Sequence, residues 1–192
     1  PCLNEEEHLP RLLAQMLADP AIDLLVVADG GSTDRSRKIV SELAERERVV
    51  LLDNPARIQS AGINLAVREY GAGHEWLLRI DAHCLYPEHY ATLLLDAART
   101  RDASAVVVPM ETVGRQGFQK AAATAQNSIL GTGGSAHRHL GEGQFVEHGH
   151  HALMRIDLFR RVGGYCEAMP CNEDAELDHR QIAAGGRSWL EP

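Results

Sequence analysis

Leu24-Leu-Val-Val-Ala-Asp-Gly-Gly-Ser-Thr-Asp34 is the segment from which the organisation of the chain can be worked out. Its first five residues, 24–28, are continuously apolar, which is typical of a strand covered on both faces. Asp29 follows this strand directly, and Gly30 and Gly31 allow a sharp turn that leaves room for a ligand. In α/β proteins, ligands bind at the carboxyl ends of the strands, so polar residues at that edge are the candidates for function.

The alternation of strands and helices extends on both sides of this segment. Apolar residues at helical spacing predict a helix over 9–17, with Asn4 and Glu7 as its start signal. Further strands are expected at 49–53, 76–80 and 105–110, separated by amphipathic helices around 39–44, 63–70 and 90–98. Residues 1–110 therefore predict an α/β fold with a mainly parallel central sheet flanked by helices.

The regular alternation of strands and helices ends after Met110. The sequence predicts helices over 118–129, 157–162 and 172–184 and a strand within 145–155, while the glycine- and histidine-rich stretch 131–149 is interpreted as a long active-site loop. Pro1 lies in what reads as the end of a strand, and residues 189–192 read as the start of another. We interpret residues 1–192 as a single domain truncated at both ends, with one half over 1–110 and a second half over 111–192.

Composition narrows the class of protein. The chain has 192 residues, with 19 Lys and Arg against 27 Asp and Glu, which gives a net charge of −8. This acidic balance argues against nucleic acid as a partner, because nucleic-acid binders carry a basic surface. No apolar run approaches the ~18–20 residues of a membrane span. The four cysteines are too scattered for a disulfide framework and are interpreted as reduced thiols.

Asp81-Ala-His83 is the sharpest motif at the strand ends. Side chains two residues apart on an extended segment point the same way, so a carboxylate and an imidazole here could hold one divalent cation. Carboxylate oxygen suits Mg²⁺ or Mn²⁺, and imidazole tilts the choice toward Mn²⁺. The alternative is a structural one, in which His83 is a hydrogen-bonded turn residue and Asp81 caps the next helix.

Two further acidic positions have both functional and structural interpretations. Asp29 could accept hydrogen bonds from a nucleotide base or ribose, although the loop after it also reads as a capped turn. Glu173 and Asp174 open a helix, where the helix dipole favours acids without any function. Asp174 and Asp178 share one helix face, and a carboxylate facing a crevice could act as a general base.

The histidines raise the question of zinc. The spacing of His137, His139, His148, His150 and His151 matches no closed zinc site, and Cys166 and Cys171 are too far apart for one. Gly131–Ser135 resembles a phosphate-binding loop only weakly, because it lacks the lysine and the preceding strand.

Several motifs, taken in order, resemble the family 2 glycosyltransferases of the GT-A fold. Pro1-Cys-Leu-Asn-Glu-Glu6 is similar to the family's "P-x-x-N-E", and Val26–Asp34 is similar to its "V-D-D/G-G-S-T-D". Arg79-Ile-Asp-Ala-His83 stands where the family has its D-x-D. Val162-Gly-Gly-Tyr-Cys-Glu167 resembles "G-G-F-D-E", and Glu173-Asp-Ala-Glu-Leu-Asp-His-Arg180 resembles "E-D-x-D/E-L-x-x-R". The form with D-A-H resembles bacterial exopolysaccharide enzymes of the succinoglycan-biosynthesis type.

The resemblance implies a role for each matched position. Asp29 would hold the nucleotide base or ribose, with Pro1, Asn4 and Glu6 lining the same pocket. Asp81 and His83 would bind a divalent cation, Mn²⁺ or Mg²⁺, that bridges the donor diphosphate. Asp174 would be the catalytic base, supported by Glu173 and Arg180. His83 replaces the family's second Asp, and the family's downstream Q-x-x-R-W motif does not occur within residues 1–192. The resemblance implies that residues 1–110 are the nucleotide-binding half and residues 111–192 the acceptor and catalytic half.

The resulting expectation is an inverting, metal-dependent glycosyltransferase that moves a sugar from a nucleotide-diphospho-sugar, expected to be a UDP-sugar, to a polysaccharide or lipid-linked acceptor. Crowding by Glu173 and Glu176 is expected to raise the pKa of Asp174. The parent protein is expected to be membrane-associated, at the cytoplasmic face of the bacterial plasma membrane. The alternatives are a sugar nucleotidyltransferase and a nucleotide-binding domain without turnover.

Overall fold

The computed structural model describes residues 1–110, 112–114, 116–128, 143–169 and 171–192. The helices are α1 (Leu9–Ala18), α2 (Ser36–Ala44), α3 (Gln59–Tyr70), α4 (Tyr90–Arg101), α5 (Gly117–Asn127), α7 (Ile156–Arg161) and α8 (Glu173–Ala183). The strands are β1 (Leu25–Asp29), β2 (Val49–Asp53), β3 (Trp76–Leu78), β4 (Ala105–Val108), β5 (Gln144–Val146), β6 (His150–Arg155) and β7 (Ser188–Leu190). The α/β class predicted from the sequence is confirmed.

The strands form two sheets within the described residues. β1 and β2 pair in parallel, and the larger sheet has the order β3-β6-β4-β7-β5. β6 lies between β3 and β4 and runs antiparallel to both, whereas β4 and β7 are parallel. The sheet is therefore mixed and not mainly parallel as the sequence predicted. The cause is the return of the chain after β5, which inserts β6 between two strands that alternation alone would place side by side.

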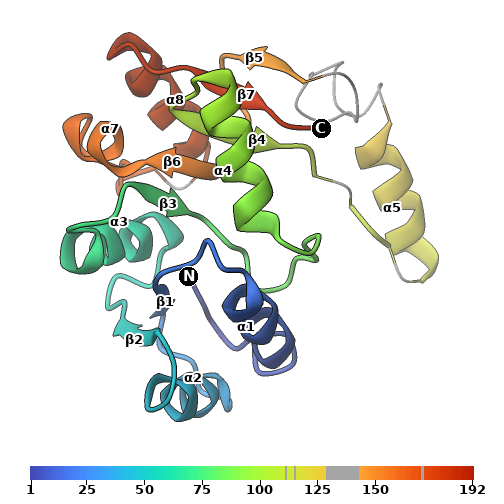
Figure 1. The fold of residues 1–192 in the computed structure, drawn as a ribbon. Helices are drawn as coiled ribbons and strands as arrows, with labels where there is room; N and C mark the ends of the chain where they lie inside the picture. The colour runs from blue at the N-terminus through green and yellow to red at the C-terminus, as the bar shows by residue number, and fades with distance from the viewer. Residues whose placement is uncertain (111, 115, 129–142, 170) are drawn as a thin grey trace.

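Helices cover both faces of the larger sheet (Figure 1). On one face, α3, α7 and α8 pack against β4 and β6 through a buried cluster that includes Val67, Met154 and Leu177. On the other face, α4 packs against the sheet through Leu94, Val106 and their neighbours. The larger sheet takes strands from both 1–110 and 111–192, so the two halves share one core.

The smaller sheet has its own core between α1 and α2. Leu9 and Leu13 of α1 pack with Val27 of β1, Val40 of α2 and Val49 of β2. An apolar cavity of about 470 Å³ lies beside this core, lined mainly by α1, β1, α3 and β3. Asp19, the residue after α1, connects this helix to α4. Its carboxylate accepts hydrogen bonds from the Ala91 N–H and the Thr92 hydroxyl of α4 at 2.8 and 2.7 Å.

The predicted start of the first helix at Asn4 is wrong. The helix begins at Leu9, and Asn4 has a left-handed backbone conformation with φ 55°. The Asn4 side chain instead serves the loop after β1, because its Oδ1 accepts a hydrogen bond from the Thr33 N–H at 2.8 Å. The polar residues before α1 are therefore used to hold a neighbouring loop and not to cap their own helix.

Candidate active site

Arg79 is the buried cation at the centre of the candidate site. It follows β3, and its N–H donates a hydrogen bond of 2.8 Å to the Ala152 carbonyl oxygen of β6. Its Nη1 lies 2.5 Å from Asp174 Oδ1 and 3.3 Å from the Tyr165 hydroxyl. Its Nε lies 3.8 Å from Asp81 Oδ1. Burial alone would lower the pKa of Arg79, but Tyr165, Asp174 and Asp81 together raise it, so the guanidinium stays charged.

Asp174 lies in the first turn of α8, where its carboxylate faces Arg79 and the histidines His150 and His151. Burial would raise the pKa of its carboxyl group, but the contact with His151 and the charges of Arg79 and His150 lower it to about 2. The expectation that Glu173 and Glu176 raise this pKa is therefore wrong. Glu176 is engaged elsewhere, because its carboxylate pairs with the Arg180 guanidinium.

Two consecutive histidines at the start of β6 approach the same carboxylate. His150 Nδ1 lies 3.8 Å from Asp174 Oδ2, and His151 Nδ1 lies 3.5 Å from Asp174 Oδ1. The pairing of β6 with β4 passes over Ala152 at this point, which interrupts the regular alternation of side chains. His150 is part-exposed, whereas the side chain of His151 is completely buried.

Asp81 joins this cluster from the end of β3. Its Oδ1 accepts a hydrogen bond from Gln59 Nε2 at 3.1 Å, and its Oδ2 lies 3.3 Å from His150 Nε2. Burial would raise the pKa of Asp81, but the contact with His150 and the charge of Arg79 lower it. His150 thus bridges Asp81 and Asp174, which are distant in the sequence and come from opposite halves of the chain.

His83 is placed differently from the sequence expectation. Residues 81–84 form a turn closed by a 3.2 Å hydrogen bond from the Cys84 N–H to the Asp81 carbonyl oxygen, so the segment is not extended. The His83 side chain is 67% exposed, and its Nδ1 lies 3.4 Å from Glu5 Oε1. The argument from strand alternation for pairing Asp81 with His83 is wrong, because a turn separates them.

The donor chemistry around the turn nonetheless suits a divalent cation with few protein ligands. Among the described residues, no three His, Cys, Asp or Glu side chains are arranged to enclose a metal ion. Mg²⁺ and Mn²⁺ take one or two carboxylates and complete their shell with water and substrate phosphates. Asp81 is a part-exposed carboxylate and His83 an exposed imidazole, so this pair fits a cation of that kind.

Asp29 has a largely internal role in the structure. Its side chain is 1% exposed, and its carboxylate accepts hydrogen bonds from the Gly31 and Ser32 N–H groups. Arg37 Nη1 lies 2.7 Å from both Asp29 Oδ2 and Asp53 Oδ1. Burial would raise the pKa of Asp29, but Ser32 and Arg37 lower it. Asp29 therefore fixes the loop after β1, and a bound ligand would meet the backbone of that loop first.

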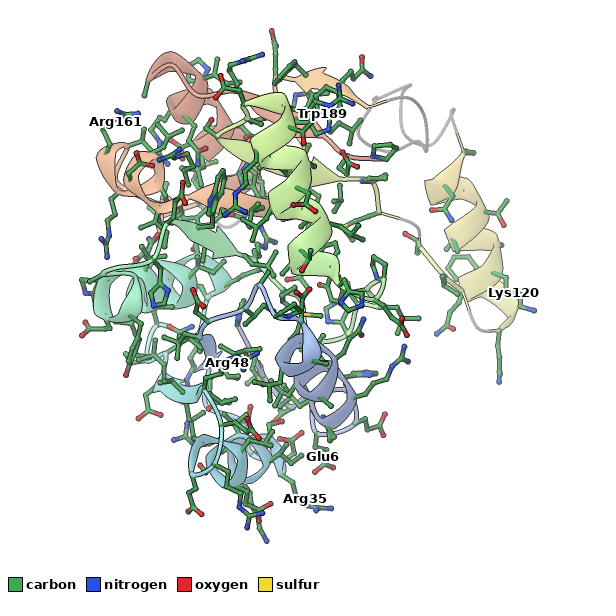
Figure 2. The ribbon with its side chains drawn as sticks, in the orientation of Figure 1. Glu6, Arg35, Arg48, Lys120, Arg161 and Trp189 are labelled. Carbon is green, nitrogen blue, oxygen red and sulfur yellow. The ribbon has the colours of Figure 1, made fainter. Side chains whose placement is uncertain are left out.

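Pro1, Asn4 and Glu6 surround the same loop. Cys2 pairs in parallel with Asp29, and Glu6 Oε2 accepts a hydrogen bond of 2.9 Å from the Arg35 N–H. Figure 2 shows Glu6 and Arg35 together at the end of the molecule formed by α1 and α2. Glu5 of the same segment reaches the turn after Asp81, where its Oε1 lies 3.4 Å from His83 Nδ1. The segment 1–6 thus lies between the loop of Asp29 and Asp81, which brings the predicted strand ends together.

Within the described residues, the two side chains expected to support Asp174 make no hydrogen bond or ion pair with it. Arg180 donates hydrogen bonds to the carbonyl oxygens of Val162 and Gly164 and to Glu176, so it holds the glycine turn before Tyr165. Among the described residues, the Glu173 side chain makes no hydrogen bond or ion pair. His137, His139 and Gly131–Ser135 lie outside the described residues.

Sequence reasoning overlooked four residues of this cluster. Arg79 and Tyr165 lie inside motifs that match the family, but the resemblance assigns them no role, and the spacing of His150 and His151 raises only the question of zinc. The signal was present in the sharing of one helix face by Asp174 and Asp178, since His151 lies between these two carboxylates.

Comparison with known proteins shows the family to which this chain belongs. The model of the family described as glycosyl transferase family 2 matches residues 1–163, so the chain belongs to that family. The fold predicted from the motifs, GT-A, is confirmed. Among curated proteins, the chain is similar to the succinoglycan biosynthesis protein ExoA of Rhizobium meliloti (strain 1021), with 53% identity over 99% of this chain and 58% of the relative. The chain therefore spans a little over half the length of that relative.

Solved structures show the same fold at low identity. The crystal structure of residues 1–349 of S. aureus TarS superposes with a TM-score of 0.73 and 14% identity, covering 100% of this chain and 56% of that one. The same TarS fragment in complex with UDP-GlcNAc gives a TM-score of 0.68 and 13% identity, covering 100% of this chain and 54% of that one.

Proposed function

We propose that this chain is the catalytic domain of an inverting glycosyltransferase that moves a sugar from a nucleotide-diphospho-sugar, in the simplest case a UDP-sugar, to a polysaccharide or lipid-linked acceptor. Membership of glycosyl transferase family 2 supports the reaction class. The similarity to a succinoglycan biosynthesis protein supports a saccharide product. TarS, which shares the fold, has been crystallised with UDP and with UDP-GlcNAc, which supports the donor class.

One observation carries this proposal. Asp81 and Asp174 are 93 positions apart in the printed sequence, yet both lie against Arg79 and His150. Each carboxylate has a lowered pKa and is therefore ionised at neutral pH. Two ionised acids in one cluster support the proposal, because sugar transfer requires charge stabilisation at the donor diphosphate and proton removal at the acceptor hydroxyl.

The reaction would proceed as a single displacement. The acceptor hydroxyl oxygen attacks the anomeric carbon, the bond from that carbon to the diphosphate oxygen breaks, and its electron pair leaves with the nucleoside diphosphate. Asp174 receives the acceptor proton. Once the acceptor oxygen begins to bond to carbon, its proton becomes strongly acidic, so a carboxylate of low pKa can still accept it. Attack from the face opposite the leaving group inverts the anomeric configuration.

Asp81 and His83 would hold the divalent cation, Mn²⁺ or Mg²⁺. When bound, such a cation supplies charge neutralisation for the leaving diphosphate. The protein's own part is to keep Asp81 ionised through Arg79 and His150 and to present it beside segment 1–6. Asp29 contributes indirectly, because it fixes the loop that would meet the nucleotide.

The experiment uses UDP-GlcNAc as the donor probe and MnCl₂ as the metal. Calorimetry of UDP binding compares the parent chain with Asp81→Asn and with Glu88→Gln, an exposed acid near the same turn. We expect Asp81→Asn to weaken Mn²⁺-dependent UDP binding about tenfold or more, and Glu88→Gln to leave it unchanged. Equal binding by all three would contradict a cation site at Asp81.

The stereochemistry and the turnover are tested on the same sample. NMR of the transferred sugar is expected to show an anomeric configuration opposite to that of the donor, and retention would contradict a single displacement. Binding of UDP without donor hydrolysis or transfer would favour a nucleotide-binding domain without turnover.

The site of action of the parent protein is a further part of the proposal. A polysaccharide or lipid-linked acceptor would place it at the cytoplasmic face of the bacterial plasma membrane, where nucleotide-sugars are available. Among the described residues, no helix has both the length and the apolar character needed to cross a bilayer. Fractionation of the full-length parent protein tests this placement.

A further inference from the structure

His151 is a completely buried histidine that lies between two carboxylates of the same helix. Its Nε2 lies 2.8 Å from Asp178 Oδ1, and its Nδ1 lies 3.5 Å from Asp174 Oδ1. The Nε2 contact is an ion pair without the direction of a hydrogen bond. The Tyr165 hydroxyl completes the surroundings at 2.9 Å from Nδ1. Burying a charged ring costs free energy unless the charge is paired, and the two carboxylates around His151 supply that pairing.

Asp178 has no exposed atoms through which it could touch a substrate. Its side chain is 0% exposed, and its Oδ2 accepts a hydrogen bond of 3.2 Å from the Gly149 N–H. The Ser188 hydroxyl of β7 donates to its Oδ1 at 3.5 Å. Asp178 can therefore act on the chemistry only through its neighbours, and His151 is the neighbour that contacts Asp174.

The two oxygens of Asp174 have different partners. Oδ1 is held by Arg79 from the end of β3 and by His151 from β6, at 2.5 and 3.5 Å. Within the described part of the chain, the one charged group recorded against Oδ2 is His150, at 3.8 Å. One oxygen is therefore fixed by buried cations, while the other points to the part-exposed side of the cluster.

We propose that His151 and Asp178 form a buried positioning pair, which holds Asp174 by its Oδ1 so that Oδ2 is the oxygen presented to the acceptor hydroxyl. The Asp178 carboxylate keeps the His151 ring charged and fixed, and His151 shares Oδ1 with Arg79. The kinetic part of this inference rests on the proposed role of Asp174 as the base; the structural part does not.

The charged and titratable groups that face Asp174 are Arg79, His150, His151 and Tyr165. Burial would lower the pKa of His151, but Tyr165, Asp174 and Asp178 raise it well above its ordinary value. Removing the imidazolium therefore takes away a cation that favours ionised Asp174, and the Asp174 pKa should rise.

The test is a carboxyl titration of the 192-residue chain that needs no substrate. Carbon-13 NMR follows the Asp174 side-chain carboxyl, assigned by its disappearance in Asp174→Asn. In the parent chain we expect this signal to stay that of a carboxylate down to about pH 4, and in His151→Asn we expect its midpoint to rise by about one pH unit or more. His179→Asn, an exposed histidine beside Asp178 on α8, is the matched control and should leave the midpoint unchanged.

Asp178→Asn provides a second variant in case His151→Asn does not fold. It keeps the shape of the side chain, removes the charge that holds His151, and should shift the Asp174 midpoint in the same direction by a smaller amount. An Asp174 midpoint that is the same in the parent chain, His151→Asn and Asp178→Asn would overturn the proposal.

The kinetic arm separates this inference from the proposed function. With UDP-GlcNAc, His151→Asn should lower kcat about tenfold or more with little change in the Kd for UDP, and should move the acidic limb of the pH profile upward. A raised Asp174 titration midpoint without any change in the pH profile of kcat would support the positioning pair. The same result would contradict the role of Asp174 as the base. A uniform loss at every pH with an unchanged Asp174 midpoint would show a merely structural role for His151.

Discussion

Arg79 and Asp174 form an ion pair of 2.5 Å that joins the end of β3 to the first turn of α8. The Arg79 side chain is 5% exposed and the Asp174 side chain 22% exposed, so the pair is largely shielded from water. It links the segment that carries Asp81 to the helix that carries the proposed base. Together with His150, which contacts both acids, this pair connects Asp81 to Asp174.

Arg79→Met should destabilise the fold as well as the site. Removing the guanidinium leaves Asp174 without its nearest cation, and breaking a buried pair costs about 3–5 kcal/mol. Urea unfolding measures the loss, with Arg161→Met as the control because Arg161 is exposed on α7 (Figure 2). A loss no larger than that of the control would show that the Arg79–Asp174 pair contributes little to stability.

Gly149→Ala should disturb the start of β6. A Cβ at this position would lie 2.7 Å from Val107 Cγ2, so strand β4 or the residues before His150 must move. Overpacking of this kind costs about 1–3 kcal/mol, and it also weakens the N–H contact to Asp178. Thermal unfolding should show a clear drop for Gly149→Ala and a much smaller one for Gly30→Ala, whose added Cβ would meet no atom closer than 3.5 Å. Equal drops would argue against the close approach at Gly149.

Arg180→Lys separates a structural role from a catalytic one. The Arg180 guanidinium donates to the carbonyl oxygens of Val162 and Gly164, and lysine cannot span both while pairing with Glu176. We expect a stability loss of about 1–2 kcal/mol by urea unfolding, with kcat of the folded protein reduced less than tenfold. A loss of kcat comparable to that of Asp174→Asn at unchanged stability would restore the sequence-based assignment of Arg180 to the catalytic group.

Acid should weaken the fold in part through Asp174. Its pKa of about 2 in the folded chain lies below the ordinary value of 3.8, so the ionised form is favoured by folding. This contribution is complete above about pH 5, is lost as the pH falls toward 2, and amounts to about 2 kcal/mol. Urea unfolding at a series of pH values should show a shallower acid dependence for Asp174→Asn than for the parent chain. Parallel curves would mean that the folded and unfolded pKa values of Asp174 are similar.

The sequence predicted the outline of the fold because its apolar runs and helix faces are local patterns. Strand β2 was placed at its observed residues, and helix α8 was placed to within a residue at each end. The position of β6 between β3 and β4 depends on pairing over long distances, which periodicity cannot reveal. For that reason the sequence predicted a mainly parallel sheet, whereas the observed sheet is mixed.

The residues of the candidate site were predictable where they belong to local sequence patterns. Asp81 and Asp174 stand out because each follows a recognisable local signal, the end of a strand or the start of a helix. Arg79 and His151 do not, because their importance lies in burial and in partners from other elements. The pKa of Asp174 was predicted in the wrong direction, since its neighbours in the sequence are acids while its neighbours in space are cations.

Asp174→Asn tests the central claim most directly, because the amide keeps the shape of the side chain and cannot accept the acceptor proton. With UDP-GlcNAc and Mn²⁺, calorimetry and a transfer assay on one preparation separate donor binding from turnover. We predict a Kd for UDP within about twofold of the parent value and a kcat at least about a hundredfold lower. Sugar transfer by Asp174→Asn at the parent rate would contradict the account.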